Sequence, residues 1–99
     1  MFYAVSVNNV ALTVENCLFT GGGVGSYGMI YAYKAFSSTI AISNSVFASS
    51  GSGVGGTSAV YVYNTNKAKP TKLTVKSTVL ENLLGHPISL TGAGATASI

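Results

Sequence analysis

The stretch Met29-Ile30-Tyr31-Ala32-Tyr33 decides the fold, because it repeats the opening Met1-Phe2-Tyr3-Ala4-Val5 after a shift of 28 positions. The same shift places residues 12–19 on residues 40–47 without a gap. Most apolar, aromatic and polar positions coincide in both pairs of segments. The chain therefore contains at least two copies of one structural unit.

A third copy follows with small insertions, since Val60 lies 30 positions after Ile30 and Leu73 lies 33 positions after Ile40. A fourth copy begins at Pro87. Self-similarity at this spacing predicts a stacked architecture, in which one unit cannot bury its own apolar face and its neighbours must complete it.

The first segment of each repeat alternates between apolar and other side chains, as a half-buried β-strand does. Two columns of equivalent positions are apolar in every repeat and are expected to face inward: Phe2, Ile30, Val60, Ile88 and Ala4, Ala32, Val62, Leu90. A second strand adds the inward columns Leu12, Ile40, Leu73 and Val14, Ile42, Val75. Period-two geometry then places five of the six tyrosines on the outside of one sheet: Tyr3, Tyr31, Tyr33, Tyr61 and Tyr63.

Asn16, Asn44 and Ser77 interrupt the second strand at equivalent positions, and the apolar pattern resumes two residues later. Asn tolerates left-handed backbone, and stacked amides can bond along a column, so we expect a bend with an internal polar ladder at these positions. A short third strand follows each bend. Three strands per coil predict an all-β, single-stranded triangular solenoid of about three to four coils, with residues 1–99 forming one segment of a longer solenoid.

Charged residues make up only 7% of the chain, against roughly a quarter in average proteins. Four of the five lysines, Lys67, Lys69, Lys72 and Lys76, lie in or just after the insertion of the third repeat. We interpret them as a solvated loop, because the absence of Arg and the lack of repeated spacing argue against nucleic-acid binding. The low charge favours an extracellular or cell-surface location, with any export signal outside this chain.

Few residues offer chemistry. Cys17 is the single cysteine, which excludes an internal disulfide, and no metal-ligand spacing or membrane-spanning apolar stretch is present. Glycines 23, 25 and 28 spell a dinucleotide fingerprint, but a strand rather than a helix is expected after them. Glu15 and Glu81 occupy unrelated columns, and His86 stands alone in a loop. We therefore expect no catalytic residue, no metal and no cofactor.

The units, written as apolar-x-apolar-x-Asn-x-x-Phe with a Gly-rich loop and a Tyr-bearing strand, resemble right-handed parallel β-helices of pectate-lyase-like proteins. The nearest likeness is to the repeats of polymorphic outer-membrane and autotransporter passenger proteins. The segments that carry it are residues 14–19 with 27–33, 42–47 with 58–63, and 75–80 with 87–90. The resemblance implies a right-handed β-helix that is either an adhesin-like rod or the framework of a polysaccharide-degrading enzyme.

The five tyrosines are the one constellation with functional content. Stacked at the ~4.8 Å spacing of adjacent strands, they either bind a glycan or a host or neighbouring surface protein, or only stabilise the sheet. We expect an interaction module without catalysis, the alternative being a polysaccharide-binding or polysaccharide-degrading protein. We also expect self-association through open coil ends, because exposed strand edges pair.

Overall fold

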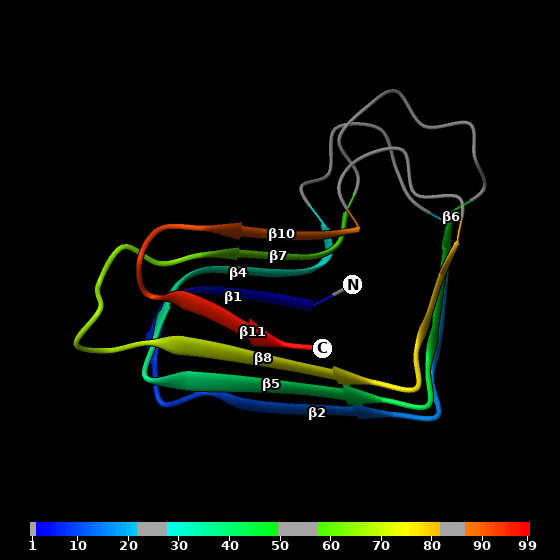
Figure 1. Ribbon diagram of the computed structural model, residues 1–99. Helices are drawn as coiled ribbons and strands as arrows, with labels where there is room; N and C mark the ends of the chain where they lie inside the picture. Colours follow the sequence, from blue (N-terminus) through cyan, green and yellow to red (C-terminus); the bar gives the residue numbers. More distant parts are fainter. Residues whose placement is uncertain (1, 22–27, 50–57, 82–86) are drawn as a thin grey trace.

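The computed structural model describes residues 2–21, 28–49, 58–81 and 87–99, and all regular structure in these ranges is β-strand (Figure 1). Sheet A is formed by β1 (Phe2–Asn8), β4 (Gly28–Phe36), β7 (Ser58–Tyr63) and β10 (Ile88–Thr91). Sheet B is formed by β2 (Ala11–Glu15), β5 (Ser38–Ser43), β8 (Thr71–Lys76) and β11 (Ala95–Ser98). Sheet C is formed by β3 (Leu18–Gly21), β6 (Val46–Ser49) and β9 (Val79–Glu81).

All strand pairs in the three sheets are parallel, and each joins equivalent positions of successive repeats. In sheet A, Phe2 pairs with Ile30, Ile30 with Val60, and Val60 with Ile88. This is the register that the sequence repeat predicts. The expectation of an all-β fold built from stacked parallel strands is therefore confirmed.

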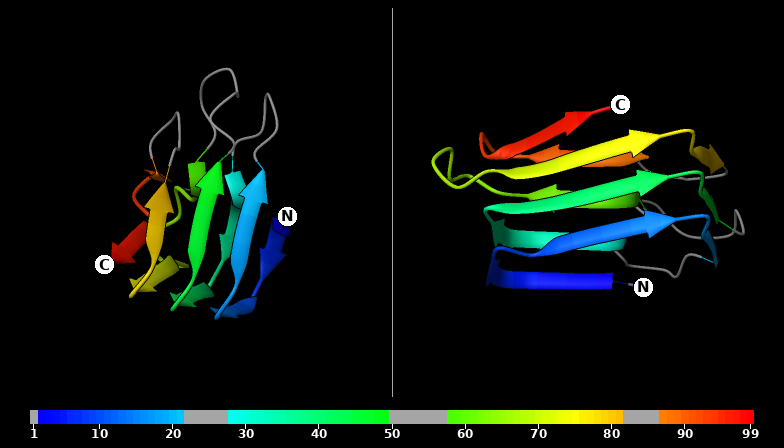
Figure 2. Two further views of the ribbon diagram at one scale, coloured as in Figure 1. Left: turned by 90° about the vertical axis from the view of Figure 1, so that its right-hand side faces the viewer. Right: turned by 90° about the horizontal axis from the view of Figure 1, so that it is seen from below.

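The chain visits sheets A, B and C in turn and returns to sheet A one strand further along the stack (Figure 1). Sheets A and B face each other, and sheet C stands across one end of the space between them. The two termini lie at opposite ends of the stack (Figure 2). Each repeat thus adds one layer to a single apolar interior.

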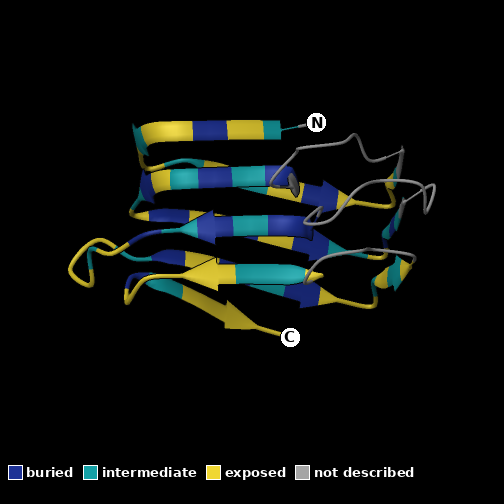
Figure 3. Ribbon diagram, turned by 90° about the horizontal axis from the view of Figure 1, so that it is seen from above, coloured by how far each residue is buried: buried dark blue, intermediate teal, exposed yellow. Residues whose placement is uncertain are grey.

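The interior is filled by the inward columns that the alternation predicts, and buried and exposed residues alternate along the strands (Figure 3). Ile30, Val60, Ile42 and Leu73 are almost completely buried. Their equivalents in the outermost layers are less covered, and Leu90 is 40% exposed, because an edge strand has a neighbour on one side only. In sheet C, the rings of Phe19 and Phe47 stack at 4.5 Å and close the interior on that side.

The expected bend after the second strand is present, since Asn16, Asn44 and Ser77 have left-handed φ values of 54°, 48° and 49°. Their side chains are exposed, so the expectation of an internal ladder at these three positions is wrong. A left-handed residue at a corner turns its own side chain to the convex side and the next one inward. The buried polar position is accordingly Ser45, one residue later.

Ser45 is 2% exposed and lies between Cys17 and Thr78 of the neighbouring repeats. Its hydroxyl accepts from the backbone N–H of Cys17 at 3.2 Å and donates to the carbonyl of Ser43 at 2.8 Å. Thr78 donates in the same way to the carbonyl of Lys76 at 2.8 Å. The small polar side chains at this corner therefore satisfy backbone groups that the bend leaves unpaired.

Several sequence interpretations fall partly or wholly outside the described residues. The glycine-rich segments after the third strands lie largely within residues 22–27 and 50–57, and His86 lies within residues 82–86. The lysines of the third repeat are described, and Lys67, Lys69, Lys72 and Lys76 are all exposed, as expected for a solvated segment.

Candidate functional site

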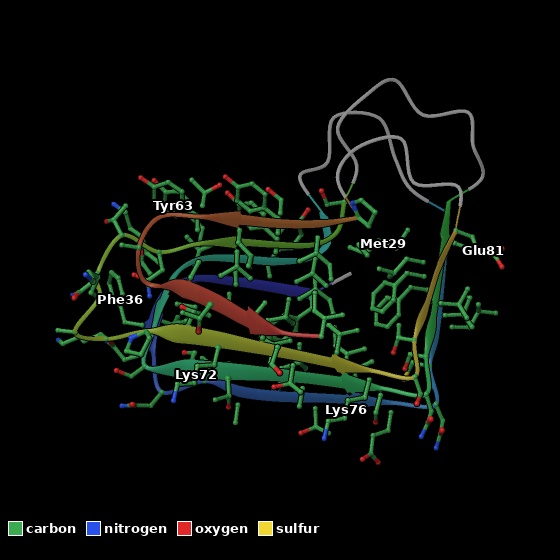
Figure 4. The ribbon with its side chains drawn as sticks, viewed as in Figure 1. Met29, Phe36, Tyr63, Lys72, Lys76 and Glu81 are labelled. Carbon is green, nitrogen blue, oxygen red and sulfur yellow. The ribbon has the colours of Figure 1, made fainter. Side chains whose placement is uncertain are left out.

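The five tyrosines predicted to share one outer surface come together on sheet A. Tyr3 pairs with Tyr31 and Tyr31 with Tyr61 in one column, and Tyr33 pairs with Tyr63 in the next. We call these five residues the tyrosine block. Tyr3 is 59% exposed, and the other four are partly exposed. Figure 4 shows Tyr63 on the outer side of sheet A.

The rings of the tyrosine block are ordered into stacks. Tyr31 and Tyr61 lie 5.2 Å apart at 13°, and Tyr33 and Tyr63 lie 4.8 Å apart at 14°. Tyr31 and Tyr33, on one strand, are nearly parallel at 3° with centroids 6.3 Å apart. Tyr3 meets Tyr31 edge to face, at 5.5 Å and 69°.

These distances determine which part of each ring is covered. If the rings of Tyr33 and Tyr63 lay flat on the sheet, their atoms would collide, because the ring centroids are only 4.8 Å apart. The two rings must therefore stack face to face. The ring faces of Tyr31, Tyr33, Tyr61 and Tyr63 therefore point along the stack toward neighbouring tyrosines, and the edges of these four rings form the outer surface.

The ends of the second tyrosine column differ in chemistry. Val5, which is 50% exposed, precedes Tyr33 in the register, and Thr91 follows Tyr63. The Lys34 ammonium lies 5.3 Å from the centroid of the Tyr33 ring, within the range of a cation–π interaction. Beyond Tyr63, the stack continues with the small hydroxyl side chain of Thr91 on β10.

The tyrosine block combines binding potential with a structural contribution. Each aromatic pair stabilises a protein by roughly 0.5–1.5 kcal/mol beyond area burial, so the stacks help to hold β4 and β7 together. Within the part of the chain that the structure describes, no pocket opens on sheet A or elsewhere.

The two carboxylates are not brought together with each other. Glu15 ends β2 in sheet B of the first repeat, and Glu81 ends β9 in sheet C of the third. In the described ranges, no three His, Cys, Asp or Glu side chains gather as metal ligands would. The same ranges contain no helix of a length and apolarity that could cross a membrane.

Sequence reasoning missed a buried polar network at the corner between sheets A and B. Asn64 is completely buried and donates through Nδ2 to the carbonyl of Lys69 at 2.8 Å and to Thr71 Oγ1 at 3.0 Å. Its Oδ1 accepts from the N–H of Asn66 at 2.7 Å, and Thr71 donates to the carbonyl of Ala35. The third repeat is longer than the first two, and this extra length is the feature of the sequence that indicates a connection with hydrogen-bond partners of its own.

This network explains why residue 94, at the adjacent turn of the fourth repeat, is a glycine. A Cβ on Gly94 would lie 2.5 Å from the carbonyl oxygen of Asn66 and 2.7 Å from the Asn64 side chain. The Gly94 N–H donates to the carbonyl of Asn64 at 2.7 Å. Only glycine allows the backbone to approach this closely.

Comparison of this chain with protein-family models, with curated proteins and with solved structures found no match.

Proposed function

We propose that the chain is a stretch of a right-handed parallel β-helix, of the pectate-lyase-like kind and nearest to the repeats of polymorphic outer-membrane and autotransporter passenger proteins. We infer that it serves as an adhesin-like interaction module of a secreted or surface-displayed protein, without chemistry of its own. The tyrosine block is its contact surface.

The architecture part of the proposal is supported by the connectivity. Sheets A and B take one strand from each of the four repeats, and sheet C takes one from each of the first three; neighbouring strands are parallel, and the chain passes through the sheets in a constant order. Crossovers between parallel strands of one sheet are right-handed in about 98% of cases, which favours a right-handed coil here. The low charge and the many Ser, Thr and Asn residues agree with an exported β protein.

The arrangement of the rings favours a protein partner over a saccharide. A sugar stacks on an exposed aromatic face, whereas Tyr33 shares one face with Tyr63 and has the Lys34 ammonium near its ring. Outward-facing ring edges and hydroxyls instead provide rigid amphipathic contact area at low entropy cost, as in tyrosine-rich protein interfaces. The geometry of the stacks is the observation that carries this proposal.

A glycan-binding function is the second candidate, and one position favours it. Thr91, the residue that follows Tyr63 in the register, is small and exposed, so it leaves space over the ring of Tyr63 for a sugar ring. The hydroxyl of Thr91 would lie under such a sugar. This candidate would use Tyr63 through its ring face and not through its hydroxyl.

Two substitutions of Tyr63 separate the candidates, because Tyr63→Phe removes the hydroxyl and Tyr63→Ala removes the ring as well. The wild-type chain and both variants are tested on a polysaccharide array and on a panel of purified extracellular proteins. Thr13→Ala, on the exposed face of sheet B, is the matched control. A protein contact predicts loss of protein binding in Tyr63→Ala and weakening in Tyr63→Phe.

The glycan candidate predicts a different pattern, in which polysaccharide binding disappears in Tyr63→Ala and persists in Tyr63→Phe. Protein binding that neither Tyr63 variant nor a Tyr33→Ala variant changes would contradict the role of the tyrosine block. Turnover of a pectin-type polymer by the chain would contradict the proposal of a module without catalysis.

A further inference from the structure

Four of the five lysines gather at one corner of the fold. Lys34 lies near the end of β4, Lys67 and Lys69 belong to the connection of residues 64–70, and Lys72 is the second residue of β8. The connection packs on the β4–β5 corner, since the N–H of Ser37 donates to the carbonyl of Lys69 at 3.2 Å. We call these four residues the lysine corner.

Negative charge lies elsewhere in the molecule. Glu15 ends β2 where the chain turns toward sheet C, and Glu81 ends β9 in sheet C. Figure 4 shows Glu81 at the opposite end of the fold from Lys72. The fifth lysine, Lys76, ends β8 two strands away from Glu15 and in the same register column. The negative charge of Glu15 therefore partly offsets the positive charge of Lys76. Among the described residues, the lysine corner therefore has no carboxylate beside it.

The connection that carries Lys67 and Lys69 is a built structure. The equivalent corners of the first two repeats need only residues 9–10 and residue 37, whereas the third uses residues 64–70. The Asn64 amide bonds to the carbonyl of Lys69, and Asn66 Oδ1 accepts from the N–H of Ala68 at 3.0 Å. Figure 1 and the right-hand view of Figure 2 show the connection projecting beyond the neighbouring corners. Its lysines are thus presented on a preorganised, convex ridge.

We propose that the lysine corner binds the surface of an anionic lipid membrane peripherally, without insertion. Lysine ammoniums near an anionic membrane surface each strengthen binding about five-fold, which for four residues amounts to several hundred-fold. Tyr33 lies beside Lys34 on sheet A and pairs with Tyr63, and amphipathic tyrosine rings are favoured at the level of lipid headgroups. A convex ridge fits a flat partner.

Two observations disfavour a nucleic acid as the partner of the lysine corner. Arg, which forms bidentate contacts with phosphate groups, is absent from the chain. The stacking of Tyr33 on Tyr63 covers a ring face that single-stranded bases would need.

Flotation of the chain with vesicles tests the proposal. Wild-type protein is mixed with vesicles of phosphatidylcholine alone or with vesicles that also contain the anionic lipid phosphatidylserine. We expect binding only to the anionic vesicles and release by high salt, because screening shortens the reach of surface charge. The double variant K67Q/K69Q should bind about 25-fold more weakly.

Lys76→Gln is the matched control, because it removes one exposed lysine from the same strand as Lys72 but outside the lysine corner. It should weaken vesicle binding by less than half as much as Lys72→Gln, although both change the net charge equally. Equal effects of Lys72→Gln and Lys76→Gln would show a response to net charge alone and would overturn the proposal. Absence of vesicle binding, or binding to a soluble sulfated polysaccharide in preference to anionic vesicles, would also overturn it.

Discussion

Replacement of Asn64 by alanine tests whether the buried corner network holds the third repeat together. The Asn64 side chain makes three hydrogen bonds, to Lys69, Thr71 and Asn66, at distances from 2.7 to 3.0 Å. Alanine would remove this partner from all three groups at a position that is itself completely buried. At about 1 kcal/mol for each bond, Asn64→Ala should lower the free energy of unfolding by about 3 kcal/mol.

A loss of this size is a large part of the stability of a small domain, which is typically 5–15 kcal/mol. The measurement is urea unfolding followed by circular dichroism, with the midpoint compared at an unchanged m-value. Limited trypsin digestion adds a local readout, because the Lys67–Ala68 bond should be cut faster once the connection is no longer held. Both measurements use the 99-residue chain.

Asn66→Ala is the control, because Asn66 Oδ1 accepts from the exposed Ala68 N–H and water can replace that bond. Its cost should be below about 1 kcal/mol. If the unfolding midpoints of the Asn64→Ala and Asn66→Ala variants coincide, or if Asn64→Ala leaves the rate of tryptic cleavage unchanged, the buried amide does not organise this corner and the reasoning is refuted.

Three further outcomes are expected. Phe47→Ala should destabilise the fold by about 3–5 kcal/mol in urea unfolding, since Phe47 is fully buried against Phe19. Leu18→Ala is the control, because the Leu18 side chain is 67% exposed, and it should change stability by less than about 0.5 kcal/mol. Similar costs for the two variants would contradict the placement of Phe47 in the core. Ser77→Gly should raise the unfolding midpoint by an amount equivalent to about 0.5–1 kcal/mol, because glycine adopts the left-handed φ of 49° without strain, and a lowered midpoint would argue against the bend. The 99-residue chain should self-associate through the edge strands β1 and β10 in sedimentation velocity at micromolar concentration, and a single monomeric species would contradict this.

Much of the fold follows from periodicity alone. The recurrence of an apolar residue at Phe2, Ile30 and Val60, which hold the same place in successive repeats, is enough to predict both the parallel pairing and its register, because a slip by one residue would turn every apolar side chain outward. The bend at Asn16 and Asn44 is likewise readable, since few residues tolerate left-handed backbone. The sequence does not show which residue of the bend faces the interior, because that depends on how the corner rotates the residue that follows.

The candidate site is only partly readable for a related reason. Alternation predicts that Tyr33 and Tyr63 share an outer surface, and they do. Alternation does not specify side-chain rotamers, which here turn the rings on edge so that they cover each other. The chemical consequence of the tyrosine block therefore depends on packing between neighbouring strands.

The sequence by itself determined that this protein is a stack of parallel β units, which residues face its interior and which tyrosines gather outside, because these are properties of a repeat and of a period of two. Only the tertiary structure decided that Ser45 rather than Asn44 is the buried polar residue of the bend, that Asn64 braces the third corner, and that Lys34 lies with Lys67 and Lys69. Those features arise at corners, where one repeat meets the next or where an irregular connection folds on itself, and the spacing of residues along one strand carries no information about such contacts.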